Sequence, residues 1–312
     1  MEVRLKPLIK GVLSFAVPSL RTTRAVGFDR TGPEYCYSVF LRHFSHAARL
    51  TGGKMPQNVA EFGPGSSIGV GLAALLAGAT RYTGLDVVDG MDDTLNLSMF
   101  DGLVAMFKAR RPIPRDGAAA HVFTPATDWD FPKDLLPNLE TSLSDARLQQ
   151  IRDDIVRKSG ACIRAAAPWT DVDLLQPGSV DWIFSQSVLE HVDGIEALYA
   201  ASARWLGPGG VMTHEIDYFC HDLTKHWNGH WAVGAPTWKL LRGRRPYLIN
   251  RLPHARHIAL LRDHGFEIVA ELQDSDRADG LPKSDFVAPF DRMSDSDAKT
   301  AVAFVVARSA RA

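Results

Sequence analysis

A glycine-rich turn between two apolar segments constrains the fold of this chain more than any other feature. The turn follows a predicted buried strand over 59–62, precedes a small-residue helix over about 67–76, and leads to a second strand over 82–85 that ends on Asp86. Gly63 and Gly65 carry no Cβ, so the backbone can turn tightly and approach a ligand closely. The N–H groups of the following helix then face that ligand. This stretch predicts a site for a nucleoside.

The spacing of the glycines argues against a dinucleotide site. The dinucleotide fingerprint requires a third glycine three residues after the second one. Ile68 occupies that position here, and the next glycine is Gly69. Asp86 suits a ribose, because a carboxylate accepts hydrogen bonds from both hydroxyls. A Rossmann-type turn for another nucleotide, or a turn that binds nothing, is the alternative at this point.

Three motifs in order resemble the class I S-adenosylmethionine (SAM) methyltransferases. Residues 61–65 (EFGPG), followed by Asp86, resemble motif I of that family. Residues 178–192 (GSVDWIFSQSVLEHV) resemble its fourth strand and the turn after it, and residues 206–210 (LGPGG) resemble the turn before its fifth strand. The resemblance implies an α/β fold: a doubly wound, seven-stranded, mostly parallel Rossmann-like sheet with a helical N-terminal segment and insertions. The last two strands are expected over 266–272 and 300–308, as an antiparallel hairpin.

The resemblance also implies a cofactor site for SAM, with S-adenosylhomocysteine as the product. In the family the glycine turn packs against the methionine part of SAM, and the acid after the second strand binds the ribose. The predicted cofactor-binding residues are Glu61, Gly63, Pro64, Gly65, Ser66, Asp86, Val87, Trp169, Ser185 and Gln186.

Trp169 stands where the family usually has an acid that binds the adenine amino group. An indole at this position could stack on adenine, and its backbone N–H could bond the base. A tryptophan packed in the core or at a hinge is the alternative.

Two histidines are the candidate catalytic residues. His214 lies near the end of a predicted fifth strand over 211–216, and the pKa of a free histidine, about 6.5, suits a base that removes a proton from a hydroxyl. Side chains alternate along a strand, so His214 points away if Glu215 faces the cleft. His191 is the second candidate, but the pair Glu190-His191 occurs in family members with unrelated substrates, which favours a structural or cofactor-shell role.

We predict no metal ligand from the sequence. His214, Asp217, His221 and Asp222 gather after the fifth strand, and a metal site formed by them is the alternative.

The acceptor is expected to bind under two insertions. We divide the chain into an N-terminal helical cap over 1–57 and a methyltransferase domain over 58–312, with insertions at about 92–158 and 218–253 forming a substrate lid. Residues 218–262 hold eight basic residues and a single acid, Asp222. Such a segment suits an anionic group such as a phosphate or carboxylate; a solvated or membrane-facing edge is the alternative.

The predicted function is methyl transfer from SAM to a polar small molecule or a glycan-type acceptor, with O-methylation expected. The residues around 214–217 and 250–266 resemble uncharacterised methyltransferases associated with glycan and polysaccharide gene sets. A SAM-binding partner protein without catalysis is the main alternative, and a NAD-type oxidoreductase is disfavoured by Ile68.

The composition of the chain limits the binding partners and the cellular compartment that we expect. A net charge of −1 gives no reason to expect nucleic acid. Three widely spaced cysteines fit a reducing compartment, so we expect a cytoplasmic protein. The basic and apolar residues 1–21 suit either a cap helix or a peripheral contact with a membrane surface. The oligomeric state is left open.

Overall fold

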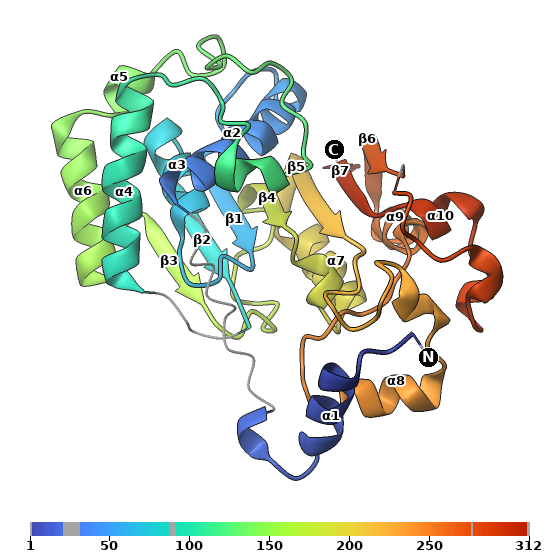
Figure 1. Ribbon diagram of the computed structural model, residues 1–312. Helices are drawn as coiled ribbons and strands as arrows, with labels where there is room; N and C mark the ends of the chain where they lie inside the picture. The colour runs from blue at the N-terminus through green and yellow to red at the C-terminus, as the bar shows by residue number, and fades with distance from the viewer. Residues whose placement is uncertain (1, 21–31, 88–91, 276, 311–312) are drawn as a thin grey trace.

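Seven strands form one sheet with helices on both faces (Figure 1). The computed structural model describes residues 2–20, 32–87, 92–275 and 277–310. The strand order is β3-β2-β1-β4-β5-β7-β6; β1 to β5 run parallel, and β7 pairs antiparallel with both β5 and β6. The strands are β1 (Asn58–Phe62), β2 (Arg81–Leu85), β3 (Ile163–Ala166), β4 (Val180–Gln186), β5 (Leu206–Asp217), β6 (Phe266–Asp274) and β7 (Val302–Ser309). The predicted doubly wound, mostly parallel α/β sheet is confirmed.

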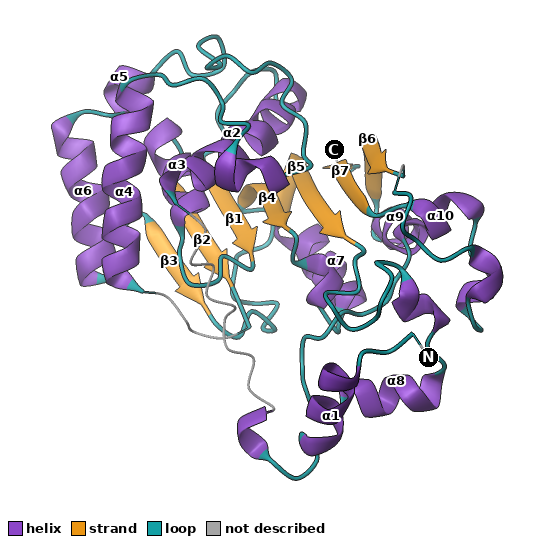
Figure 2. Cartoon of the chain, viewed as in Figure 1, coloured by secondary structure: helices purple, strands orange, loops and turns teal. Residues whose placement is uncertain are grey.

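The helices divide into two layers and a separate pair (Figure 2). One face of the sheet carries α2 (Pro33–Leu50), α3 (Gly69–Ala77), α4 (Asp93–Lys108), α5 (Leu139–Ser142) and α6 (Asp145–Arg157). The other face carries α7 (Ile195–Trp205) and α9 (His254–Asp263), with the short α10 (Asp295–Lys299) beside them. Helices α1 (Leu5–Leu13) and α8 (Ala235–Arg242) pack on each other away from the sheet. The two N-terminal helices therefore lie apart, and a single cap over 1–57 stays a prediction.

Side chains point alternately to the two faces along the central strands, so each face of the sheet has its own hydrophobic core. Val59 of β1 and Trp182 of β4 point toward α2 and α3, whereas Ala60 and Ile183 point toward α7 and α9. Trp182 and Ile183 are fully buried. Burying one such side chain stabilises a fold by about 1.5–3 kcal/mol, so hydrophobic packing on both faces fixes which way each strand faces.

Arg42 holds part of the first insertion over the sheet. This buried side chain of α2 donates hydrogen bonds to the carbonyl oxygens of Val122, Thr124, Pro114 and Ala119 at 2.8, 3.2, 3.0 and 3.3 Å. Burying a guanidinium is costly unless its donors find acceptors, and these carbonyl oxygens serve Nη1 and Nη2, so the bonds and the loop conformation depend on each other. Residues 114–124 thus lie near the carboxyl end of β5. Helices α4 and α6, from the same insertion, pack on one face of the sheet instead.

Asp154 of α6 provides a similar anchor for the start of β3. Its carboxylate accepts hydrogen bonds from Ser159 Oγ and from the N–H groups of Gly160, Cys162 and Ile163 at 2.6–2.9 Å. Burial alone would raise the pKa of Asp154, but the bonds from Ser159, Cys162 and Ile163 outweigh it and hold the pKa below the usual 3.8.

We expect Asp154→Asn to lower the free energy of unfolding by about 2–3 kcal/mol at neutral pH, because an amide nitrogen cannot accept these bonds. A lowered pKa stabilises the fold above the unfolded value and loses that contribution as pH falls through the folded pKa. The difference between wild type and variant in urea unfolding should therefore shrink below about pH 4. Asp153→Asn, an exposed neighbour on the same helix, is the control. Equal effects of the two substitutions would contradict the assignment.

Candidate cofactor and acceptor site

A crevice is expected where the chain leaves β1 and β4 in opposite directions. From β1 the chain passes through α3 to β2, and from β4 it passes through α7, on the other face, to β5. Open α/β sheets bind ligands at the carboxyl ends of the strands at such a switch point. The glycine turn after β1 and the residues after β4 meet here.

The glycine turn adopts a conformation that requires glycine. Gly63 and Gly65 have φ values of +70° and +69°. A Cβ on Gly63 would lie 2.5 Å from Val188, which follows β4. The Gly63 N–H donates to the carbonyl oxygen of Leu85 at 2.8 Å, so the turn is tied to the end of β2.

Asp86 joins the turn to the segment after β2. One carboxylate oxygen accepts from the Gly65 N–H at 3.0 Å, and the other accepts from the Val87 N–H at 2.6 Å. Each carboxylate oxygen has two lone pairs, so a carboxylate that accepts from N–H groups can also accept from hydroxyls. The structure therefore brings together Gly63, Gly65, Asp86 and Val87, and their binding of a cofactor stays a prediction.

Glu61 is buried beneath the turn. Its Oε2 accepts from the Tyr82 hydroxyl at 2.6 Å. Burial raises the pKa of Glu61 to about 8, although the Tyr82 bond opposes this rise and Asp86 adds to it. Glu61 is only 4% exposed, so the structure shows it as a support beneath the glycine turn.

Pro64 and Ser66 complete the predicted turn. Pro64 lines a cavity of about 360 Å³ together with Gly65 and Asp86, on the side of α4 and α6. The Ser66 carbonyl oxygen accepts from the Asp92 N–H at 3.1 Å, which ties the turn to the beginning of α4.

Trp169 lies at the crevice but not in the predicted way. It lines a small cavity of about 60 Å³ with Gly63, Asp86, Val87 and His191. Its ring packs edge-on against Phe62 at 5.5 Å. Its backbone N–H donates to the Asp86 carbonyl oxygen at 3.0 Å, so the expected bond from that N–H to adenine is wrong.

Five lining residues of this cavity were not predicted as site residues, and two of them, Phe62 and Leu85, end β1 and β2. Val188 and Val192 flank His191 after β4, and Tyr247 comes from the segment after α8. The position of Val188 just beyond a strand end could have indicated it. Tyr247 carried no sequence signal, because it reaches the crevice only through tertiary packing.

Ser185 and His214 lie inside the core, contrary to their predicted roles. Both are completely buried, and Ser185 Oγ and His214 Nδ1 bond each other at 2.7 Å. The His214 ring lies 6.4 Å from Tyr199 of α7, on the face away from Glu215. Burial lowers the pKa of His214 to about 3. Alternation along β5 turns His214 away from the cleft, so we do not retain it as a base or Ser185 as a cofactor contact.

Gln186 belongs to a network on the opposite face. It bonds His43 through Oε1 at 3.1 Å and donates from Nε2 to Glu215. The second Glu215 oxygen accepts from the Thr124 N–H and hydroxyl at 2.6 and 2.7 Å. This network attaches the loop that Arg42 holds to the carboxyl ends of β4 and β5.

A larger cavity of about 530 Å³ opens at those strand ends and is the candidate acceptor site. Its walls include Ser187, Glu215, Asp217, Phe219 and Arg277. Burial raises the pKa of Asp217 to about 6, while the Phe219 N–H and Arg277 oppose the rise. The Phe219 N–H donates to Asp217 at 2.6 Å. The cavity thus presents carboxylates more than cations.

His191 reaches the crevice between the two cavities. Its Nδ1 lies 3.1 Å from the Tyr247 carbonyl oxygen, and its ring lies 4.8 Å from the His221 ring. Burial lowers the pKa of His191 to about 4, and His221 adds to the effect. His191 is therefore neutral at physiological pH.

None of the eight basic residues over 218–262 lines the candidate acceptor cavity, and three of them have partners elsewhere. Arg251 is 9% exposed and lies between Trp238 and Phe290, 4.4 Å from each ring. Arg242 pairs with Asp193, and the longer Arg256–Glu196 contact spans 3.9 Å. The local excess of positive charge therefore gives no support to an anionic acceptor.

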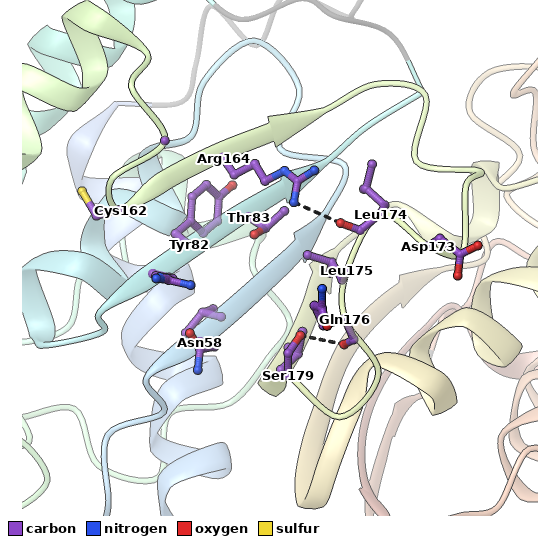
Figure 3. A pocket seen from close by; sticks show the side chains of 14 residues that line it. Asn58, Tyr82, Thr83, Cys162, Arg164, Asp173, Leu174, Leu175, Gln176 and Ser179 are labelled. Atoms are coloured by element: carbon purple, nitrogen blue, oxygen red, sulfur yellow. Dashed lines mark hydrogen bonds between the residues drawn. The ribbon is translucent and has the colours of Figure 1, made fainter.

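A further hollow of about 450 Å³ lies at the opposite end of the strands (Figure 3). Asn58, Arg81 and Val180 line it from the beginnings of β1, β2 and β4. Arg164 of β3 donates to the Leu174 carbonyl oxygen at 3.0 Å across its wall. Ligands of doubly wound sheets bind at the carboxyl ends, so we do not place the cofactor in this hollow.

Solved structures of methyltransferases are similar to this chain at low sequence identity. No protein-family model matches the chain, and no curated protein matches it. Similar solved structures include a complex between the Haloferax volcanii Trm112 methyltransferase activator and a putative methyltransferase, with 16% identity, coverage of 90% of this chain and 94% of that chain, and a TM-score of 0.41. A SAM-dependent methyltransferase from Methanosarcina mazei has 12% identity, coverage of 83% and 94%, and a TM-score of 0.43. A putative sarcosine dimethylglycine methyltransferase from Galdieria sulphuraria has 11% identity, coverage of 88% of this chain and 86% of that chain, and a TM-score of 0.45.

The assignment of the fold rests on the sheet itself and not on these likenesses. The strand order is β3-β2-β1-β4-β5-β7-β6, with β7 antiparallel to β5 and β6. It agrees with the doubly wound, mostly parallel sheet and the antiparallel last pair that the sequence resemblance implied. The chain has the Rossmann-like fold of the class I SAM-dependent methyltransferases.

Proposed function

We propose that this chain transfers a methyl group from SAM to a hydroxyl of a neutral, polar acceptor. The observation that carries the proposal is the Asp86 carboxylate, which accepts hydrogen bonds from the Gly65 and Val87 N–H groups beside a turn that only glycine can form. This donor and acceptor set fits a nucleoside: the turn leaves room for close approach, and Asp86 offers lone pairs to a ribose. The small cavity beside Trp169 must widen for adenosine, and an outward shift of Tyr247 would open it.

SAM supplies an activated methyl group on a sulfonium, so the protein mainly has to align the acceptor oxygen with it. We place the acceptor in the cavity lined by Ser187 and Asp217, which adjoins the crevice after β4. A hydroxyl must lose its proton on methylation, and the Asp217 carboxylate is placed to accept it. His191, at the same crevice, is the alternative proton acceptor.

The chemistry of that cavity favours a sugar-like acceptor over an anion. Glu215, Asp217 and Asp274 contribute carboxylates, which accept hydrogen bonds from hydroxyls and repel phosphates, whereas Arg277 contributes the opposite charge. The volume of about 530 Å³ lies in the range of small-molecule sites. A glycan-type or other polyhydroxylated acceptor therefore fits the walls better than the anionic one that the local charge count suggested.

We expect wild-type protein to bind S-adenosylhomocysteine in calorimetry and to show no binding of NAD. Asp86→Ala should weaken that binding at least tenfold, about 1.4 kcal/mol or more, because it removes the proposed ribose acceptor and loosens the turn. Asp101→Ala, which removes an exposed acid on α4, should leave the affinity unchanged. Equal affinities in all three proteins, or tighter binding of NAD, would refute the cofactor assignment.

Transfer of a labelled methyl group separates an enzyme from a binding partner without catalysis. With saturating SAM and a panel of sugars, phenols and lipids, label should appear on a hydroxylated acceptor, and Asp217→Asn should reduce turnover while S-adenosylhomocysteine affinity is kept. Cofactor binding without transfer to any member of the panel would favour the partner protein.

We also propose that α1 contacts an anionic membrane surface. Leu5, Ile9, Val12 and Leu13 are 45–70% exposed and recur at the spacing of one helix face. Gly11, on another side of the helix, packs against the backbone of α8 at Leu241, so the apolar face stays outward. Lys6 and Lys10 are exposed on the same helix, and Arg244 lies over Phe15 nearby. Apolar side chains flanked by cations suit a surface of anionic lipid.

None of the described helices combines the length and the apolarity that crossing a bilayer requires. We expect the protein to float with vesicles that contain anionic lipid and to float less with neutral vesicles or at high salt. Ile9→Asp should reduce flotation several-fold, because it places a charge in the apolar face. Val156→Asp, which changes an apolar residue on α6 that is at least as exposed as Ile9, is the control. Flotation that is the same for both variants would contradict the proposal.

A further inference from the structure

A buried carboxylate after β4 has no hydrogen-bond partner in the described part of the chain. Glu190 lies in the short 3-10 helix Leu189–His191 and is 4% exposed, yet neither carboxylate oxygen makes a hydrogen bond to the residues that the structure describes. Its backbone is well anchored, because the Asn250 N–H donates to the Glu190 carbonyl oxygen at 2.7 Å. An uncompensated buried carboxylate costs several kcal/mol, so it demands either a proton or a cation.

The orientation of His191 leaves a lone pair facing this carboxylate. A carbonyl oxygen can only accept, so the 3.1 Å bond to Tyr247 requires the proton of neutral His191 on Nδ1. Its Nε2 is then an acceptor, and it lies 3.9 Å from Glu190 Oε1. When Glu190 is ionised, two acceptors face each other across this gap, and neither can satisfy the other. A second residue that fixes one ring nitrogen in this way is typical around metal-bound imidazoles.

His221 brings a second imidazole to the same place. It follows β5 with a φ of +47°, and its ring lies 4.8 Å from the His191 ring. Glu190, His191 and His221 each offer one ligand atom, and these three atoms lie within 4.8 Å of one another. Asp217, whose Oδ2 is 3.8 Å from His221 Nε2, contributes a further carboxylate beside the cluster.

We propose that Glu190, His191 and His221 bind one divalent transition-metal ion, such as Zn²⁺, at the crevice between the two cavities. Two neutral imidazoles and a carboxylate are a ligand set that such ions favour, at metal–ligand distances of about 2.0–2.2 Å. These distances require the ligand atoms to approach one another by about 1 Å on binding. The exposed side chain of His221 has room for this shift. The ion would take His191 out of the role of proton acceptor and leave that role to Asp217.

This inference differs from the metal site considered from the sequence. That alternative grouped His214, Asp217, His221 and Asp222. The structure buries His214 in the core and leaves the Asp222 side chain 88% exposed, beside Arg4. The proposed site includes the buried Glu190 instead. Metal binding does not rest on the proposed methyl transfer and can be tested without SAM or an acceptor.

The test uses the full chain after treatment with a chelator and dialysis. Titration with Zn²⁺ in calorimetry should give about one equivalent and a higher thermal unfolding temperature, and Co²⁺ should give visible absorption bands. Glu190→Gln and His221→Ala should each weaken Zn²⁺ binding at least tenfold and abolish the rise in unfolding temperature. His226→Ala is the matched control, because His226 is exposed to the same degree as His221 but lies outside the cluster.

Glu190→Gln also reports on the metal-free protein. It removes the unpaired negative charge, so the metal-free variant should be at least as stable as metal-free wild type, which shows that lost binding is not lost folding. No Zn²⁺ or Co²⁺ binding by wild type would overturn the proposal and leave a protonated Glu190 as the explanation. Binding that is equal in wild type, Glu190→Gln and His221→Ala would overturn it as well.

Discussion

The hydrogen bonds of the Asp86 carboxylate are the interaction on which the rest of the site depends. They connect the turn after β1, through Gly65, to the segment after β2, through Val87. The parallel register of Phe62 with Leu85 brings both strand ends to the same level. One side chain therefore closes the glycine turn and presents an acceptor at the sheet edge. Removing it changes both the shape of the turn and the chemistry offered to a ribose.

Local sequence was sufficient to predict the fold and the local structure around the glycine turn, whereas cofactor binding there stays a prediction. The strand, turn and helix around Gly63 lie within about thirty residues, and their apolar spacing and glycines depend on neighbours in the chain. The direction of side chains farther along the sheet was not determined in the same way. In β5 the sequence allowed either His214 or Glu215 to face the cleft. Pairing with β4, which sets Ser185 opposite His214, and packing under α7 decided it.

The remaining differences arise from contacts between residues far apart in the sequence. Counting charges over 218–262 indicated an anionic ligand, but the count could not show that Arg251 lies between two aromatic rings. Nor could it show that Arg42, from α2, holds a loop some eighty residues later in the chain. Trp169 was placed near the crevice correctly, but its N–H bonds the Asp86 backbone instead of a ligand. Such partners follow from tertiary packing, which has no periodic signal.

Several acidic side chains lie at the carboxyl edge of the sheet, and they differ in the hydrogen bonds that they accept. Glu61 receives the Tyr82 hydroxyl, and Glu215 receives Thr124 and Gln186, whereas Glu190 receives no such bond among the described residues. Low-dielectric walls concentrate the potential of those acids that are ionised in the crevice, and Glu61, whose pKa burial raises to about 8, adds little to it at neutral pH. That potential favours a cation over a neutral or anionic ligand. A sulfonium cofactor is positive before methyl transfer and neutral after it, so the same field would bind the reactant more tightly than the product and assist exchange. A divalent ion at Glu190 would reduce this field, and the affinity for a sulfonium should then fall as the metal site fills.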